Sequence, residues 1–189
     1  RPSYIQMRKQ IDLLNPASVL ALTATATPAV IADVCSRLSI NPTDGVLAHA
    51  VGRDNIMMHA QLCATDEERR QAALKLIVEA PHLKESAVIV YVWQQRDAEA
   101  MATFFQAHDV KALPYHAGMT SGQRTKVQTQ FLRSKIRVVV ATIAFGLGVD
   151  KADVRGVIHM HLPRSIENYV QEIGRAGRDG KPAHAHLLY

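Results

Sequence analysis

Beyond residue 55, apolar residues fall into short continuous runs that alternate with stretches of helical spacing. Several of the runs are rich in β-branched residues, as is typical of strands that are buried on both faces. The runs predict strands at 56–63, 87–92, 111–114, 136–141, 154–159 and 183–188. The stretches between them predict helices at 65–80, 98–108, 120–132 and 165–175. Regular alternation of this kind indicates an α/β fold, with a parallel sheet covered by helices on both faces.

Polar residues mark where two of these helices begin. Thr65 precedes Glu68 by three positions, and Thr120 precedes Gln123 by the same interval. This is the spacing of a capping box, in which the threonine hydroxyl and the longer side chain satisfy backbone N–H groups of the first turn. Both helices are therefore predicted to start at these threonines.

The first forty residues follow a different pattern. Helical spacing over 3–14 is interrupted by Asn15 and Pro16, and the apolar residues 19–22 predict a short buried strand. Thr27 is a predicted N-cap, with Pro28 at the first position of a helix that continues to Leu38.

Periodicity disappears between residues 41 and 55, where proline, glycine and aspartate accumulate, as in a surface linker. The predicted organisation is one segment at 1–41, a linker at 42–55 and a domain at 56–189.

Composition narrows the class of protein only modestly. The 189 residues are 48% hydrophobic and 21% charged, as in a globular protein, and the net charge of +5 is compatible with a polyanionic partner. Cys35 and Cys63 form neither a zinc motif nor a disulfide framework, so a reducing intracellular setting is expected. No apolar run reaches the roughly 18 residues of a membrane span, so no membrane partner is expected. Because the chain begins with Arg1, we expect a piece of a longer protein.

The segment 171–180 carries the most specific chemistry. It places Arg175 and Arg178 one helical turn apart, beside Gly174 and Gly177. Guanidinium groups bind phosphate oxygens with two parallel hydrogen bonds, so two of them on one helix face could neutralise charge during phosphoryl transfer. The alternative is a solvated helix end with basic side chains.

Four segments together resemble the motifs of a superfamily 2 helicase, including motifs III, V and VI. They are Leu22-Thr-Ala-Thr-Ala-Thr27, Tyr115-His-Ala-Gly-Met119, Ala141-Thr-Ile-Ala-Phe-Gly-Leu-Gly-Val-Asp150 and Gly174-Arg-Ala-Gly-Arg-Asp-Gly180. The sequences of the last two segments are similar to the corresponding motifs of the RecQ family of DNA helicases and differ from those of RNA helicases in the same superfamily. Arg53-Asp54-Asn55 and 180–184 most resemble the Rothmund-Thomson branch.

The resemblance implies a RecA-like second helicase lobe, preceded by the tail of the first RecA-like lobe. It further implies a 3′–5′ DNA helicase that binds ATP and Mg²⁺ between two lobes and acts on single-stranded and forked DNA. The chain contains neither a Gly-x-x-x-x-Gly-Lys-Ser/Thr string nor an Asp-Glu-x-His string, so this piece is expected to be inactive alone. The implied location is the nucleus in a eukaryote and the cytoplasm otherwise.

The resemblance also assigns roles to individual residues. Arg178 matches the arginine finger, and Arg175 a second phosphate contact. ATP binding or coupling falls on Gln171, Gly148, Asp150, Thr23, Ala24 and Thr25. DNA contacts fall on Thr142, His116, Gly118 and Gln94.

Several of these residues could instead have purely structural roles. The threonines could satisfy backbone groups at a strand end, and His116 could be a packed residue. The chain has Val92-Trp-Gln-Gln95 where the family usually has Cys-Asn-Ser, so Gln94 or Gln95 could replace that asparagine. Trp93 could stack on a base or fill the core. No metal site is predicted, because His159 and His161 lack nearby cysteine or carboxylate partners arranged for a metal, so they are expected to be core or surface histidines.

All the motifs are expected beyond the carboxyl ends of the strands, where ligands bind in open α/β sheets. Two other functions remain open: a translocase that acts on RNA or moves along duplex DNA without unwinding it, and a non-enzymatic binding module.

Overall fold

The computed structural model describes residues 2–23, 26–48, 52–146 and 150–189. The chain divides into two compact units, Arg1–Gly52 and Arg53–Tyr189, each of which is described by itself. The division falls inside the segment predicted as a linker. None of the described helices is both long and apolar enough to cross a bilayer.

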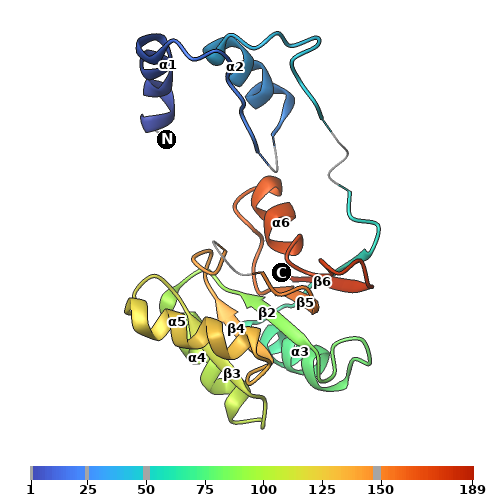
Figure 1. Ribbon diagram of the computed structural model, residues 1–189. Helices are drawn as coiled ribbons and strands as arrows, with labels where there is room; N and C mark the ends of the chain where they lie inside the picture. The colour runs from blue at the N-terminus through green and yellow to red at the C-terminus, as the bar shows by residue number, and fades with distance from the viewer. Residues whose placement is uncertain (1, 24–25, 49–51, 147–149) are drawn as a thin grey trace. The chain divides into compact units, whose positions relative to one another are not determined.

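The second unit contains a six-stranded sheet in which every strand pair is parallel (Figure 1). The strands are β1 (Ile56–Gln61), β2 (Ala87–Tyr91), β3 (Ala112–Tyr115), β4 (Val138–Ala141), β5 (Val154–His159) and β6 (Ala183–Leu188). Their order across the sheet is β1-β6-β5-β2-β4-β3. All six strands predicted for the domain are present, and the α/β prediction is confirmed.

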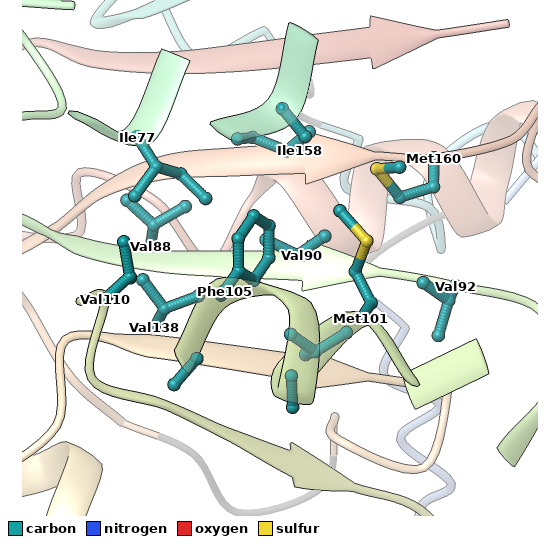
Figure 2. Packing of buried hydrophobic residues seen from close by; sticks show 14 of the residues in the cluster. Ile77, Val88, Val90, Val92, Met101, Phe105, Val110, Val138, Ile158 and Met160 are labelled. Carbon is teal, nitrogen blue, oxygen red and sulfur yellow. The ribbon is translucent and has the colours of Figure 1, made fainter. Parts of the chain in front are cut away.

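Helices cover both faces of this sheet. They are α3 (Asp66–Glu79), α4 (Gln95–Gln106), α5 (Ser121–Leu132) and α6 (Ile166–Ile173). Alternate residues of the strands pack against α3 and α4 on one face and against α5 and α6 on the other, giving two buried clusters. Figure 2 shows the first cluster, where Phe105 of α4 lies close to Val90 and Val138 of neighbouring strands.

The predicted caps are present at the helix starts. The Thr65 hydroxyl accepts a hydrogen bond from the N–H of Glu68 at 3.1 Å. The Glu68 carboxylate accepts from Ala64, one residue before the position of a strict capping box. At Thr120 the reciprocal pair with Gln123 is complete, at 3.3 and 2.8 Å.

The described residues of the first unit form the helices α1 (Pro2–Leu14) and α2 (Pro28–Leu38). The Thr27 hydroxyl accepts from the N–H of Val30 at 3.3 Å, as predicted for an N-cap. The predicted strand at 19–22 is wrong: these residues form no strand, and Leu20 and Leu22 are 82% and 85% exposed. An apolar run becomes a strand only when a neighbouring strand satisfies its backbone groups, and no described segment pairs with this one.

Candidate functional site

The two arginines of segment 171–180 lie in a turn beyond α6. The helix ends at Ile173 with Gly174 as its C-cap, so the prediction that Arg175 and Arg178 share one helix face is wrong. Gly177 has a φ of +58°, which redirects the chain, and its N–H bonds to the carbonyl of Val154 at 2.9 Å. This arginine turn, residues 174–178, is therefore anchored to the start of β5.

Two side chains just before β1 hold the arginine turn in place. Arg53 donates to the carbonyl of Gly177 at 2.6 Å and to that of Ala176 at 3.3 Å. Asn55 donates to the carbonyls of Gly177 and Lys181, at 2.8 and 2.9 Å. Sequence reasoning noted Arg53 and Asn55 only as marks of a family branch and missed this bracing role. Their positions immediately before an edge strand gave no indication that they would reach this turn.

Arg175 ties the arginine turn to the loop after β4. Its Nη1 donates to the carbonyl of Gly146 at 2.6 Å, while its Nε is buried without a hydrogen-bond partner among the described residues. A Cβ on Gly146 would come within 2.9 Å of the guanidinium, so glycine permits this close approach. Tyr91 supports the same loop, because its hydroxyl donates to the carbonyl of Phe145 at 3.0 Å. Burial raises the pKa of Tyr91, which keeps this hydroxyl protonated as a donor.

Arg178 is more accessible than Arg175. Its Nη1 lies 2.8 Å from a carboxylate oxygen of Asp150, and the two side chains are 35% and 87% exposed. An ion pair this exposed is held weakly, so either partner can be exchanged for another ligand. Gln171 is exposed on α6. The structure thus brings Arg178 and Asp150 together.

Three of the predicted nucleic-acid residues lie along one edge of the sheet. Gln94 follows β2, Thr142 follows β4 and His116 follows β3, and these strands are neighbours in that order. The N–H of Thr142 bonds to the carbonyl of Tyr115 at 3.2 Å, which joins two of the strand ends. The carboxyl-edge prediction holds for these residues. It is wrong for the arginine turn, which α6 carries back to the amino end of β5.

The residues along this edge differ in accessibility. His116 is 5% exposed and lies 3.2 Å from the Glu99 carboxylate, although neither ring nitrogen has hydrogen-bond geometry to a partner among the described residues. Thr142 is also buried, and its hydroxyl makes a long contact of 3.5 Å with the N–H of Ala144. At Gly118 a Cβ would lie 2.2 Å from the side-chain oxygen of Gln95, so glycine allows the loop to lie close to this side chain.

An open hollow of about 250 Å³ lies beside Gln94. Its lining includes Trp93, Arg69, Arg70, Arg96 and His161. Trp93 is 60% exposed, its indole N–H donates to the carbonyl of Leu162, and its ring stacks on His161 with centroids 4.6 Å apart. The core-filling alternative for Trp93 is therefore wrong, and much of its side chain is accessible to a ligand.

The other residues singled out in the sequence fall elsewhere. Thr23 is exposed in the first unit, and Ala24, Thr25 and Gly148 lie outside the described residues. His159 is buried, in agreement with the prediction of a core histidine. Its Nε2 lies 2.7 Å from an oxygen of Glu172 in a buried pair, because α6 brings that glutamate over β5.

This lobe, with its braced arginine turn and its row of strand-end polar residues, has the RecA-like architecture of a helicase lobe. Residues 68–180 match the helicase conserved C-terminal domain, and the chain belongs to that family. Over its whole length it is 39% identical to the ATP-dependent DNA helicase Q-like 5 of Arabidopsis thaliana, of which it covers 21%. It is also 39% identical to the ATP-dependent DNA helicase RecQ of Pasteurella multocida (strain Pm70), of which it covers 29%.

A solved structure gives the same fold. A DEAD box protein from the hyperthermophile Methanococcus jannaschii superposes with a TM-score of 0.66 at 29% identity, covering 86% of this chain and 43% of that one. The predicted RecA-like lobe and the resemblance to RecQ-type helicases are thereby confirmed. The chain spans between a fifth and a third of the length of the two RecQ-type relatives.

Proposed function

We propose that this chain supplies the second motor lobe of an ATP-dependent 3′–5′ DNA helicase of RecQ type. Residues 1–41 would be the last part of the first lobe and 42–55 the interlobe linker, with the lobe itself at 56–189. The family match and the RecQ-type relatives support this proposal. Assignment to the Rothmund-Thomson branch stays a prediction.

The braced arginine turn is the observation that carries the proposal. Four side-chain hydrogen bonds from Arg53 and Asn55 to the carbonyls of Gly174, Ala176 and Gly177, together with the backbone bond to Val154, fix the turn that presents Arg178. A preorganised guanidinium stabilises developing phosphate charge without reorganisation at the moment of reaction. Arg178 would contact the γ-phosphate. Arg175 would hold the loop after β4, and its buried Nε would make the second phosphate contact.

We assign the ATP phosphates to the arginine turn, because Arg175 supplies a second cation near Arg178 and Asp150 lies 2.8 Å from Arg178. Bound ATP would supply the phosphoryl group whose transfer to water drives the motor, and Mg²⁺ would be held mainly by the first lobe. Gln171, Asp150, Gly148 and the threonine segment 23–25 would complete the coupling elements.

The carboxyl edge of β2, β4 and β3 would form part of the DNA track. Gln94, Thr142, His116 and Gly118 are its proposed contacts, and single-stranded and forked DNA its ligands. Gln94 and Trp93 are accessible now, whereas Thr142 and His116 are buried and would contact DNA only after a local rearrangement. The parent protein would act where DNA is, in the nucleus of a eukaryote or the cytoplasm of a prokaryote.

The decisive experiment is ATP hydrolysis by the parent protein, with and without single-stranded DNA, in wild type and Arg178→Ala. We expect DNA to stimulate the wild type and the substitution to lower turnover by at least about a hundredfold, because an arginine finger contributes on the order of 10³ to 10⁵ in rate. DNA affinity should change only a few-fold. Lys75→Ala, which removes one positive charge from the exposed surface of α3, is the matched control and should behave as wild type.

Each alternative function predicts a different result. A translocase would hydrolyse ATP and fail to separate a forked duplex, and an RNA motor would be stimulated by RNA in preference to DNA. A binding module would bind DNA without hydrolysing ATP in either variant. Equal losses of DNA binding and turnover in Arg178→Ala would contradict the role given to this arginine.

A further inference from the structure

Four histidines converge near the edge of the sheet, on the face covered by α3. His59 lies on the edge strand β1, His184 and His186 lie on β6, and His82 lies in the turn after α3. In the strand register, His59 is opposite His186, and Met57 is opposite His184. Opposed residues share a face, so the three strand histidines point the same way. Leu188, two residues after His186, packs in the same cluster as Ile77 of α3.

The ring nitrogens lie at the separations that a metal site requires. His59 Nε2 is 3.1 Å from His184 Nδ1, and His82 Nε2 is 3.2 Å from His186 Nε2. One nitrogen from each of His59, His184 and His186 lies within 4.8 Å of the others. With Zn–N bonds of 2.0–2.1 Å, two ligands of a tetrahedral zinc ion are about 3.3 Å apart. Side-chain rotations that shorten the longer separations toward about 3.3 Å would close the cluster around an ion.

The contacts between the rings are also compatible with a bound cation. Two imidazole nitrogens that face each other at 3.1 Å repel through their lone pairs unless a proton or a metal ion lies between them. Imidazole nitrogens are also the commonest metal ligands in proteins.

We propose that His59, His184 and His186 bind a divalent transition-metal ion, with His82 as the fourth ligand. Imidazole donors suit Zn²⁺, whereas Mg²⁺ and Ca²⁺ take oxygen ligands. The site goes beyond the sequence prediction, which expected no metal.

The ion would act as a structural clamp. It would join the edge strand β1 to β6 and to the turn between α3 and β2. β1 begins at Ile56, directly after Arg53 and Asn55, so the clamp would also fix the strand whose entry braces the arginine turn. A site formed only in the folded state adds its binding free energy to stability.

The test is a Zn²⁺ titration of the chain after chelator treatment, by competition with a colorimetric chelator, together with the visible absorption of Co²⁺ as a probe of coordination. We expect one ion per chain, a Co²⁺ spectrum of four-coordinate intensity and a higher thermal midpoint with metal. His59→Gln and His184→Gln should each weaken Zn²⁺ binding by at least roughly tenfold. His108→Gln, which replaces an exposed histidine after α4, is the control and should bind as wild type.

Circular dichroism of each metal-free variant separates ligand loss from unfolding. His59 is exposed, so its replacement should leave the fold intact and its titration remains interpretable. The proposal is overturned if the wild type shows no saturable Zn²⁺ binding, or if a folded His59→Gln binds as tightly as the wild type. Metal binding by this chain needs neither ATP nor DNA, so the outcome is independent of the helicase proposal.

Discussion

Gly177 is the residue on which the shape of the arginine turn depends most directly. Its φ of +58° is costly for residues with a Cβ, and a Cβ there would lie 2.5 Å from the Asn55 side chain and 2.9 Å from the carbonyl of Lys181. We therefore expect Gly177→Ala to lower the free energy of unfolding by roughly 2–4 kcal/mol, combining backbone strain with the steric clash. Urea unfolding followed by circular dichroism measures this loss.

Gly180 provides the matched control, because it has a φ of +77° and open space around its missing Cβ. Gly180→Ala should incur only the conformational cost of about 1–2 kcal/mol. Equal losses at the two positions would show that the contacts with Asn55 and Lys181 do not constrain the turn.

Arg53 acts on the arginine turn through three backbone carbonyls, those of Gly174, Ala176 and Gly177. If the proposed function is correct, Arg53→Ala in the parent protein should lower DNA-stimulated turnover by about 10- to 100-fold, because displacement of a catalytic group by about 1 Å costs that much. Arg53→Lys keeps the charge but not the forked geometry, so it should recover only part of the rate. Full recovery by lysine would mean that charge alone, without positioning, is what the site needs.

At the scale of elements, the sequence predicted best where the signal is local. Thr27, Thr65 and Thr120 cap helices as expected, because a cap depends on residues three positions apart. The end of α6 was predicted too late, because the bond from Gly177 to Val154 that stops the helix is a tertiary contact. The run at 19–22 was misread because strand formation depends on a partner that hydrophobicity does not reveal.

The candidate site shows the same division between local and distant signals. Gln94, Thr142 and His116 could be placed along one edge, since neighbouring parallel strands end together. The histidine cluster could not, because His59 and His184 are 125 positions apart and meet only through the pairing of β1 with β6. Which strands are neighbours is decided by the packing of the whole sheet, and spacing in the sequence does not encode it.

The pairing of β1 with β6 should make stability depend on pH. His184 and His186 have folded-state pKa values of about 4, against 6.5 for an unperturbed histidine. Between these values the unfolded chain binds more protons than the folded one, so stability is full above pH 6.5 and falls as the pH drops toward 4. Asp153 and Asp179 have pKa values lowered by hydrogen bonds, chiefly from Lys151 and Arg155 respectively, and their contribution is lost only at still lower pH.

Urea unfolding at a series of pH values in the presence of a chelator measures this dependence without metal. His184→Gln should flatten the slope between pH 4 and 6.5, whereas His108→Gln should retain it. An unchanged slope in His184→Gln would show that other groups cause the acid sensitivity.

At the scale of the whole molecule, the two units differ in how much of their own surface they bury. Among the described residues, the buried apolar side chains of the first unit are Cys35 and Leu38, whereas both clusters around the sheet lie within Arg53–Tyr189. Burial of apolar surface is the main favourable term in folding, so the second unit contains the core it needs.

We therefore expect residues 53–189 to fold alone, with a cooperative thermal transition whose midpoint lies within a few degrees of that of the whole chain. A second fragment, 62–189, tests where the folding unit must begin, because it lacks Arg53, Asn55 and β1. In the whole chain β1 pairs with β6 from Ile56 to Gln61. Its loss would leave β6 as an unpaired edge and remove the bracing of the arginine turn, so this fragment should unfold at lower temperature or aggregate. Loss of the cooperative transition in 53–189 would instead mean that the first unit contributes to the core, whereas an unchanged transition in 62–189 would mean that β1 and its histidine are dispensable for the fold.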